Sequence, residues 1–127
     1  MTEKDDLVFI GHILDNIEKI EKFSKNLDMG ELEKNELRQY AIVRAIEIIG
    51  EASKNISQNL KDKYKEVQWK EIAGMRDKVI HYYFGVNLDV VWGVINNHLP
   101  VLKEQMLKIK LDLIEIKKKD EKTKNRK

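Results

Sequence analysis

The sequence predicts an all-α protein, an antiparallel bundle of four to five helices. Apolar residues recur at steps of three and four almost throughout the 127 residues, which is the period of an α-helix, and no segment shows the sustained alternation of a strand. One proline and six glycines leave few positions at which a helix must stop. The length suits one domain with a hydrophobic core of its own.

The first predicted helix covers about residues 4–27. Its apolar residues repeat at helical spacing and its charged residues lie opposite them. The sequence Asp28-Met29-Gly30 ends this helix, because glycine supplies the backbone freedom that a helix C-terminus uses. The predicted buried face consists of Leu7, Ile10, Ile13, Leu14, Ile17, Ile20 and Phe23.

The second predicted helix covers about residues 31–55. Its stretch from Tyr40 to Ile49 is apolar on more than one side, which indicates a helix at the centre of the bundle. Gly50 lies inside this helix, where glycine costs about 1 kcal/mol relative to alanine. We therefore expect a neighbouring helix to approach closely at Gly50.

Residues 56–68 are polar and rich in lysine, and they predict either a short helix or a loop. A third helix is predicted to begin near Trp69 and to continue to a stop at 85–87, where glycine and asparagine occur. A fourth helix is predicted from Leu88 to about residue 116. Because Pro100 lies within it, we expect a kink near Asn96 or a break before Leu99. Short connections between the helices favour antiparallel packing.

The charge of the chain is distributed unevenly. Residues 117–127 carry seven Lys/Arg and two Asp/Glu, or +5, so residues 1–116 carry −3 within the overall +2. We therefore predict a helical bundle over residues 1–116 and a basic, disordered tail over 117–127. The tail could be a solvated end, or it could bind phosphate groups through counterion release.

Composition excludes several classes of site. The chain has no cysteine, which rules out disulfides, thiolate nucleophiles and cysteine-based zinc sites. Neither a signal peptide nor a run of roughly 20 apolar residues is found, so we expect a cytoplasmic protein without a membrane segment. The three histidines lack metal-ligand spacing, and no phosphate-binding glycine loop occurs, so no metal or cofactor is predicted.

The segment from Arg76 to Tyr83 is the best candidate for chemistry. Arg76 precedes His81 by five residues, which on one helix is about 140° and roughly 7.5 Å, so the two side chains would not share a face. Arg76 and Tyr83 are seven apart and would share one. A histidine can move a proton near neutral pH and an arginine can stabilise a phosphorane-like transition state, which suits metal-free RNA cleavage. The alternative is an ordinary surface pair.

Several stretches together resemble the HepT-like group of HEPN ribonucleases. They are the Arg-x4-His-x-Tyr motif met by Arg76, His81 and Tyr83, the sequence RAIEIIGEA at 44–52, WKEIAGMR at 69–76, and residues 88–102. Proteins of this group are toxins whose antitoxin is a minimal nucleotidyltransferase, MntA. The resemblance covers roughly residues 4–116.

The resemblance implies a homodimer in which the motif helices of two subunits line a shared cleft. Arg76 and His81 would be the catalytic pair of a metal-independent endoribonuclease, and Asp77 would orient one of them. Tyr83 matches the tyrosine that an MntA-like antitoxin modifies with AMP. The added phosphate would place charge and bulk where RNA must bind.

Two carboxylates on the second predicted helix are further candidates. Glu47 and Glu51 are four residues apart and share a face, from which either could orient Arg76 or His81. The alternative is that both simply lie on the solvent face. For the whole protein, two other interpretations stay open: a non-catalytic HEPN module that binds the partner or substrate of a nucleotidyltransferase, and a structural dimerisation bundle.

Overall fold

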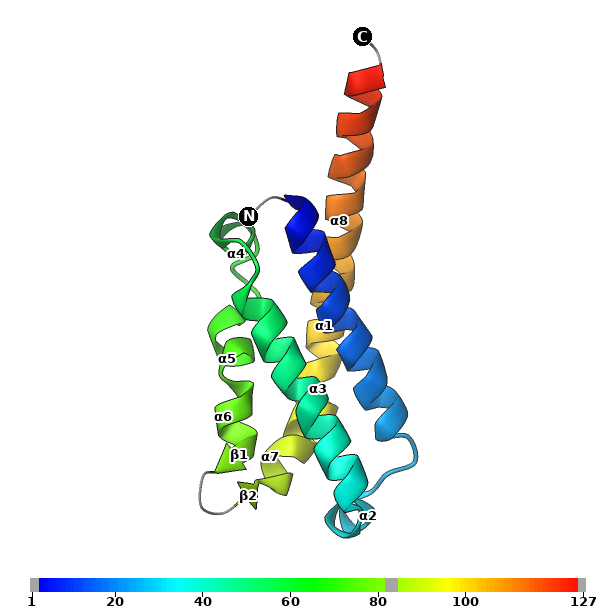
Figure 1. Cartoon of the computed structure of the whole chain (residues 1–127), viewed down its shortest axis with the longest axis vertical. Coiled ribbons are helices and arrows are strands. Elements are labelled where there is room, and N and C mark those ends of the chain that lie inside the picture. The colour runs from blue at the N-terminus through cyan, green and yellow to red at the C-terminus, as the bar shows by residue number, and fades with distance from the viewer. Residues whose placement is uncertain (1–2, 82–84, 126–127) are drawn as a thin grey trace.

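The computed structural model of the chain describes residues 3–81 and 85–125, and α-helices dominate them, which confirms the predicted all-α class. The long helical segments run alternately up and down (Figure 1). The helices are α1 (Glu3–Phe23), α2 (Met29–Lys34), α3 (Glu36–Lys54), α4 (Gln58–Lys63), α5 (Trp69–Ala73), α6 (Met75–Val79), α7 (Leu88–Gly93) and α8 (Leu99–Asn125), with a π-helical turn, η1 (Val94–His98), before α8.

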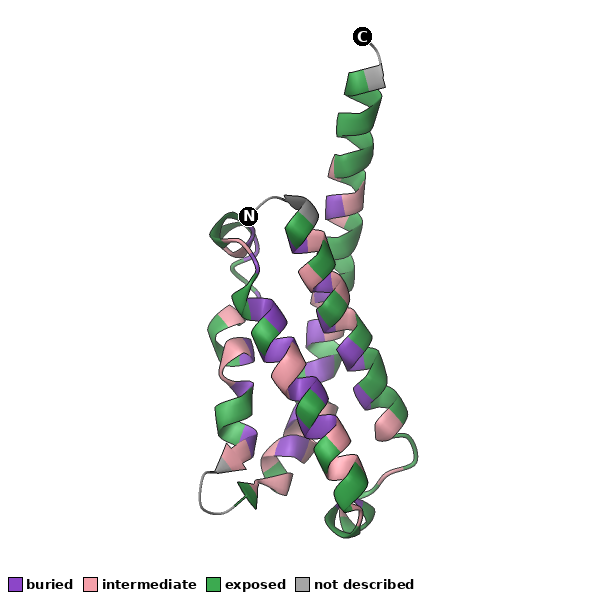
Figure 2. Cartoon of the chain, viewed as in Figure 1, coloured by how far each residue is buried: buried purple, intermediate pink, exposed green. Residues whose placement is uncertain are grey.

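Helix α3 lies at the centre of the bundle, as its sequence predicts. It packs against α1 on one side and against α5 and α6 on another, while α1 also contacts α8. The buried residues form one cluster along the facing sides of these helices (Figure 2). The predicted face of α1 is confirmed where Ile10, Ile13, Ile17 and Ile20 are buried.

The second predicted helix is interrupted at Asn35, which separates α2 from α3. The Asn35 side chain accepts a hydrogen bond from the backbone N–H of Arg38 at 3.0 Å, so it caps the start of α3. Asp28 caps α2 in the same way through the N–H of Glu31. Such side chains satisfy backbone groups at a helix start and compete with helix continuation, which explains the break.

The prediction of one helix from Trp69 to residue 84 is wrong. Helix α5 ends before Gly74, α6 ends at Val79, and the chain becomes extended at Ile80, with φ −117° and ψ 121°. Strand β1 (Ile80–His81) then pairs antiparallel with β2 (Gly85–Val86). Arg76 and His81 therefore do not share a helix, and the 140° separation does not describe them.

A π-helical turn lies where Pro100 predicts an irregularity. Across η1 the N–H of Leu99 donates to the carbonyl of Val94, five residues back instead of four. In a regular α-helix Pro100 could donate no hydrogen bond to the carbonyl of Asn96, and its ring would press against that carbonyl. The wider π turn places this irregularity before the proline, between α7 and α8.

Helix α8 continues to Asn125, so residues 117–125 are helical in the structure, where the sequence predicts a disordered tail. Charges four residues apart, such as Lys117 and Glu121, favour helix, and lysines near the C-terminus suit its dipole. Figure 1 shows this last part of α8 projecting beyond the other helices, at the end of the molecule opposite α6, β1 and β2. None of the described helices is both long and apolar enough to cross a membrane.

Polar contacts hold the segment between α3 and α5. The hydroxyl of Tyr64 donates to the Asp112 carboxylate at 2.6 Å, and burial together with this hydrogen bond raises the pKa of Tyr64 to about 12. The buried carboxylate of Asp6 accepts from the N–H and the hydroxyl of Ser57 at 2.8 and 2.6 Å. The indole of Trp69 donates to the Tyr64 carbonyl at 3.0 Å. These contacts place the start of α5, and with it α6.

Gly50 lies at the close approach that the sequence predicts. It is buried, and a Cβ atom there would lie 3.4 Å from the carbonyl oxygens of both Ile72 and Ala73. These atoms belong to the backbone of α5, which cannot move away as easily as a flexible side chain. The absence of a side chain at Gly50 therefore lets α5 pack directly on α3.

Replacing Gly50 with leucine is expected to lower the free energy of unfolding by about 1–3 kcal/mol, because the new side chain would separate α3 from α5. The matched control is Gly11→Leu in the middle of α1, where, among the described residues and apart from the adjoining backbone of α1 itself, no atom lies within 4 Å of where a Cβ would be. There we expect a gain of about 0.5–1 kcal/mol from helix propensity. Urea unfolding measures both, and equal effects at the two positions would contradict the close-packing explanation.

Candidate active site

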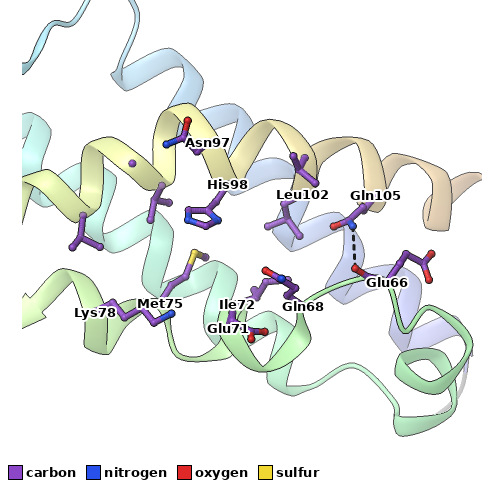
Figure 3. A pocket seen from close by; sticks show the side chains of 14 residues that line it. Glu66, Gln68, Glu71, Ile72, Met75, Lys78, Asn97, His98, Leu102 and Gln105 are labelled. Carbon is purple, nitrogen blue, oxygen red and sulfur yellow. Dashed lines mark hydrogen bonds between the residues drawn. The ribbon is translucent and has the colours of Figure 1, made fainter.

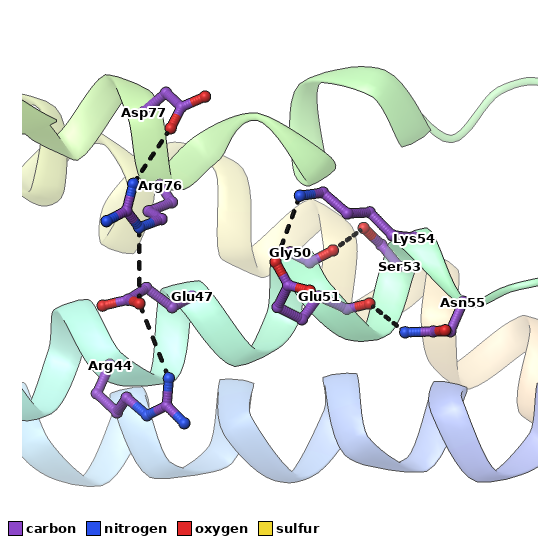
Figure 4. Close-up of polar contacts among 9 residues, drawn as sticks. All are labelled: Arg44, Glu47, Gly50, Glu51, Ser53, Lys54, Asn55, Arg76 and Asp77. Carbon is purple, nitrogen blue, oxygen red and sulfur yellow. Dashed lines mark hydrogen bonds and ion pairs between the residues drawn. The ribbon is translucent and has the colours of Figure 1, made fainter.

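Arg76 lies on the side of α6 that faces α3. Its Nε is 3.7 Å from Oε2 of Glu47 on α3, and its Nη1 is 3.5 Å from Oδ1 of Asp77 (Figure 4). These distances are those of ion pairs and exceed the 2.7–3.2 Å of a good N–H···O hydrogen bond. The side chain of Arg76 is 50 % exposed. The guanidinium is thus oriented by carboxylates and still accessible to an anion from solvent.

Two buried residues fix α6 in this orientation. Met75 and Val79 are one turn apart and belong to the hydrophobic core. Because residues three or four apart share a helix face, burying this pair turns Arg76 toward α3. The spacing of Arg76 from Met75 and Val79 thus sets the direction of its side chain, and the packing of α6 on α3 sets which residues it contacts.

The structure separates the two carboxylates that the sequence singles out. Glu47 is partly buried and lies beside Arg76, and its Oε2 is also 3.8 Å from Nη1 of Arg44. Glu51 is exposed and pairs with Lys54 at 3.3 Å, one turn further along α3 (Figure 4). Of the two, only Glu47 is placed to orient Arg76.

His81 lies at the end of β1, directly after α6. Its backbone pairs with Gly85 across the two-residue ladder, and Gly85 adopts a positive φ of 76°. The His81 side chain and the whole of Tyr83 lie outside the described residues. The catalytic pairing of Arg76 with His81 and the modification of Tyr83 therefore stay predictions.

A hollow of about 650 Å³ is lined in part by Glu47, the ion-pair partner of Arg76, and is called the α3 hollow below. The sequence predicts Tyr40 as part of the buried stripe of its helix, but Tyr40 is 62 % exposed and lines this hollow. Arg44 also lines it and was not a predicted site residue. Helical spacing could have singled out Arg44 in the sequence, because positions 40, 44 and 47 share a helix face. The hollow is lined by Glu36, Gln39, Tyr40, Val43, Arg44, Glu47, Ile80, Gly85, Val86 and Leu88.

A second hollow, of about 520 Å³, lies between α5–α6 and the α7–η1–α8 segment. Figure 3 shows His98 pointing into it between Met75 and Leu102, and Gln105 closes one end by donating to the Glu66 carbonyl at 3.4 Å. From α6 it is lined by residues other than Arg76. This hollow shares no lining residue with the α3 hollow, so His98 lies apart from Glu47, the partner of Arg76.

The described side chains of the site can be compared with the needs of two ligands, a metal ion and a phosphate. No three histidine, aspartate or glutamate side chains among those that the structure describes lie together in a way that could hold a metal ion. The Arg76 guanidinium instead offers a permanent positive charge with several donors, which matches the oxygens of a phosphate. The described part of the site is thus suited to binding an anion.

The model of the ribonuclease HepT-like family matches residues 13–109, which include Glu47, Arg76 and His81. The chain belongs to the HepT-like ribonuclease family. This confirms the resemblance seen in the sequence. The HepT-like match covers most of the bundle and ends within α8, before its projecting part.

Relatives of this HepT-like chain include proteins whose names describe them as ribonucleases. It is 40 % identical over 115 residues to "Putative RNase MJ0125" of Methanocaldococcus jannaschii, covering 91 % of the chain and 99 % of that protein. It is 40 % identical over 102 residues to "Probable ribonuclease HepT" of Thermococcus cleftensis, covering 80 % and 93 %.

A longer relative, "Gamma-glutamylcyclotransferase and putative RNase MJ0434" of Methanocaldococcus jannaschii, is 43 % identical over 110 residues. The alignment covers 87 % of this chain but only 50 % of that protein, so the chain spans about half of its length. No solved structure matches the chain.

Proposed function

We propose that this HepT-like chain is an endoribonuclease that cleaves RNA without a metal ion, with Arg76 and His81 at the reacting phosphate. The observation that carries the proposal is the Arg76 guanidinium, which is half exposed and held beside Glu47, with His81 five residues later at the end of β1. Membership of the ribonuclease HepT-like family supports the choice of RNA as substrate.

In the proposed reaction the imidazole of His81 takes the proton from a ribose 2′-OH. The 2′-oxygen attacks the adjacent phosphorus, the bond from phosphorus to the 5′-oxygen breaks, and that oxygen leaves with a proton. The products are a 2′,3′-cyclic phosphate and a 5′-hydroxyl. Arg76 stabilises the negative charge that gathers on the phosphate oxygens in the transition state.

A homodimer supplies the second proton-transfer group of this scheme. One imidazole cannot both remove the first proton and deliver another in a single step, whereas two copies of the motif in a shared cleft offer two imidazoles. The described part of the site agrees with an open arrangement, because Arg76 and Asp77 are exposed in a single subunit.

We further propose that the chain is the toxin of a toxin–antitoxin pair and that an MntA-like nucleotidyltransferase neutralises it. Tyr83 lies two residues after His81, in the connection between β1 and β2. An AMP group on Tyr83 would bring a phosphate and a base next to the reacting groups, and like-charge repulsion would oppose RNA binding there.

Cleavage in the presence of a chelator tests the enzymatic proposal. The purified chain, incubated with single-stranded RNA and excess EDTA, is expected to produce fragments ending in 2′,3′-cyclic phosphate, because neither proton transfer nor charge stabilisation depends on a metal. Mass spectrometry of the fragments identifies these ends. Cleavage that appears only after magnesium is added would contradict the metal-free scheme. Absence of cleavage, with stable binding to a nucleotidyltransferase, would support the binding-module alternative.

The antitoxin proposal predicts a change of mass at one residue. Chain co-expressed with an MntA-like nucleotidyltransferase is expected to gain the mass of one or more AMP groups, because the enzyme transfers AMP to an accessible tyrosine hydroxyl. Intact-mass measurement and peptide mapping locate the groups. The Tyr83→Phe variant should gain none and stay toxic, and Tyr82→Phe is the neighbouring control. A neutralised toxin with unmodified Tyr83 would show inhibition by binding alone.

A further inference from the structure

The α3 hollow lies between the first half of α3 and the residues that flank the β1–β2 ladder. From α3 it is lined by Tyr40, Arg44 and Glu47, and across from them by Ile80, Val86 and Leu88. Its walls come from segments about 40 residues apart in the sequence. Ile80 directly precedes His81, and Glu47 pairs with Arg76, so the hollow lies beside residues that contact the proposed catalytic motif.

Two side chains that line the hollow are largely exposed to solvent. Tyr40 is 62 % exposed, and the side chain of Arg44, one helical turn further along, is 69 % exposed. A single exposed ring is ordinary on a protein surface, but here the ring lies beside an exposed guanidinium. An aromatic face with a guanidinium one turn away presents the groups that bind a nucleobase and a phosphate.

Glu47 connects this pair to the catalytic arginine. Its Oε2 atom lies 3.8 Å from Nη1 of Arg44 and 3.7 Å from Nε of Arg76, so one carboxylate holds two guanidinium groups from α3 and α6 (Figure 4). Both groups are at ion-pair distance, so an incoming phosphate can replace the carboxylate on Arg44 while Arg76 keeps its support. Two arginines spaced around one anion suit the successive phosphates of a nucleic-acid strand.

We propose that the α3 hollow binds the nucleotide next to the scissile phosphate of the RNA, with its base stacked on Tyr40 and its phosphate on Arg44. The inference rests on the proposed ribonuclease function. A protein partner or a second copy of the chain would be a different occupant of this hollow, and the test below distinguishes both from RNA. Stacking on Tyr40 tolerates any base, so this subsite contributes affinity more than sequence choice.

Binding of a short fluorescein-labelled single-stranded RNA, measured by anisotropy, tests the subsite. His81→Ala serves as the background so that the RNA stays intact. Tyr40→Ala is expected to weaken binding about 5- to 100-fold, the range for loss of one base stack, while Tyr40→Phe binds as the parent does. Arg44→Ala should reduce the slope of log affinity against log salt by about 0.7, and Arg44→Lys should keep the slope. Leu111→Ala and Lys108→Ala on the exposed side of α8 are the matched apolar and charged controls.

The outcomes separate the subsite from the enzyme. Equal binding by Tyr40→Ala and Tyr40→Phe overturns the subsite, as does a parent protein that binds no RNA. Sedimentation of the same variants shows whether Tyr40→Ala changes the oligomeric state, in which case the face is a contact between copies and the inference is wrong. If Tyr40 supports RNA binding but the unsubstituted chain cleaves nothing, the ribonuclease proposal fails and the subsite stands. If the unsubstituted chain cleaves RNA and Tyr40→Ala leaves that cleavage unchanged, the subsite fails and the ribonuclease proposal stands.

Discussion

The His81→Ala variant is expected to cleave RNA at least about 10²-fold more slowly than the unsubstituted chain, and up to about 10⁴-fold. Alanine cannot accept the 2′-OH proton or deliver one to the leaving oxygen, so the loss should appear in kcat. Initial rates on a labelled RNA, measured from pH 5 to 9, give kcat and its pH profile. The unsubstituted chain should show a bell-shaped profile, because one imidazole must be neutral and another protonated.

A second histidine provides the control for this result. His98→Ala removes an imidazole of the same kind from the hollow between α5–α6 and α8, which does not include Arg76. We expect it to leave the cleavage rate unchanged. A His81→Ala protein that cleaves RNA normally, or a His98→Ala protein that loses cleavage, would contradict the assignment of His81. Loss of thermal stability in His81→Ala would point instead to a folding role.

The Arg76→Ala variant is expected to lose cleavage by about 10²–10³-fold, the size of the effect when one transition-state donor is removed. Its stability should change by less than about 1 kcal/mol, because Arg76 is half exposed and its ion-pair distances to Glu47 and Asp77 are long. Arg76→Lys should recover only part of the rate, since an ammonium group cannot bind two phosphate oxygens in the fork geometry of a guanidinium. Cleavage rates and urea unfolding of the same preparations give both quantities.

Lys54→Ala is the control for loss of an ion pair without loss of chemistry. It removes a comparable exposed pair, Lys54 with Glu51, one turn away from Glu47 on α3. We expect neither its cleavage rate nor its stability to change appreciably. A large fall in stability for Arg76→Ala, with no activity in the unsubstituted chain, would favour the structural-bundle interpretation of the motif.

The helical period alone was enough to predict the all-α class and the buried face of α1. Apolar side chains repeating every three to four residues can be buried together only by a helix, so pattern and packing agree. The close approach at Gly50 and the irregularity before Pro100 were also predicted from the sequence, because a missing side chain or a missing N–H constrains the backbone wherever it occurs. The resemblance to the HepT-like family was likewise visible in the sequence, and the family match over residues 13–109 confirms it.

Only the tertiary structure decided how the groups of the site are arranged. Helical spacing placed Arg76 and His81 on one helix, but pairing of Ile80 with Val86 in β1 and β2 changes the chain direction between them. Spacing also left Glu47 and Glu51 equivalent, whereas the packing of α6 on α3 brings Arg76 to Glu47 alone.

Tyr40 shows the same limit, since an apolar ring at a helical position reads as buried until the neighbouring elements are placed. The sequence by itself therefore determined the all-α class and the family, and it singled out the candidate segment around Arg76, because these depend on local periodicity and motif. Contacts between segments far apart in the chain determined which groups surround Arg76, because these contacts depend on where other elements end and pack.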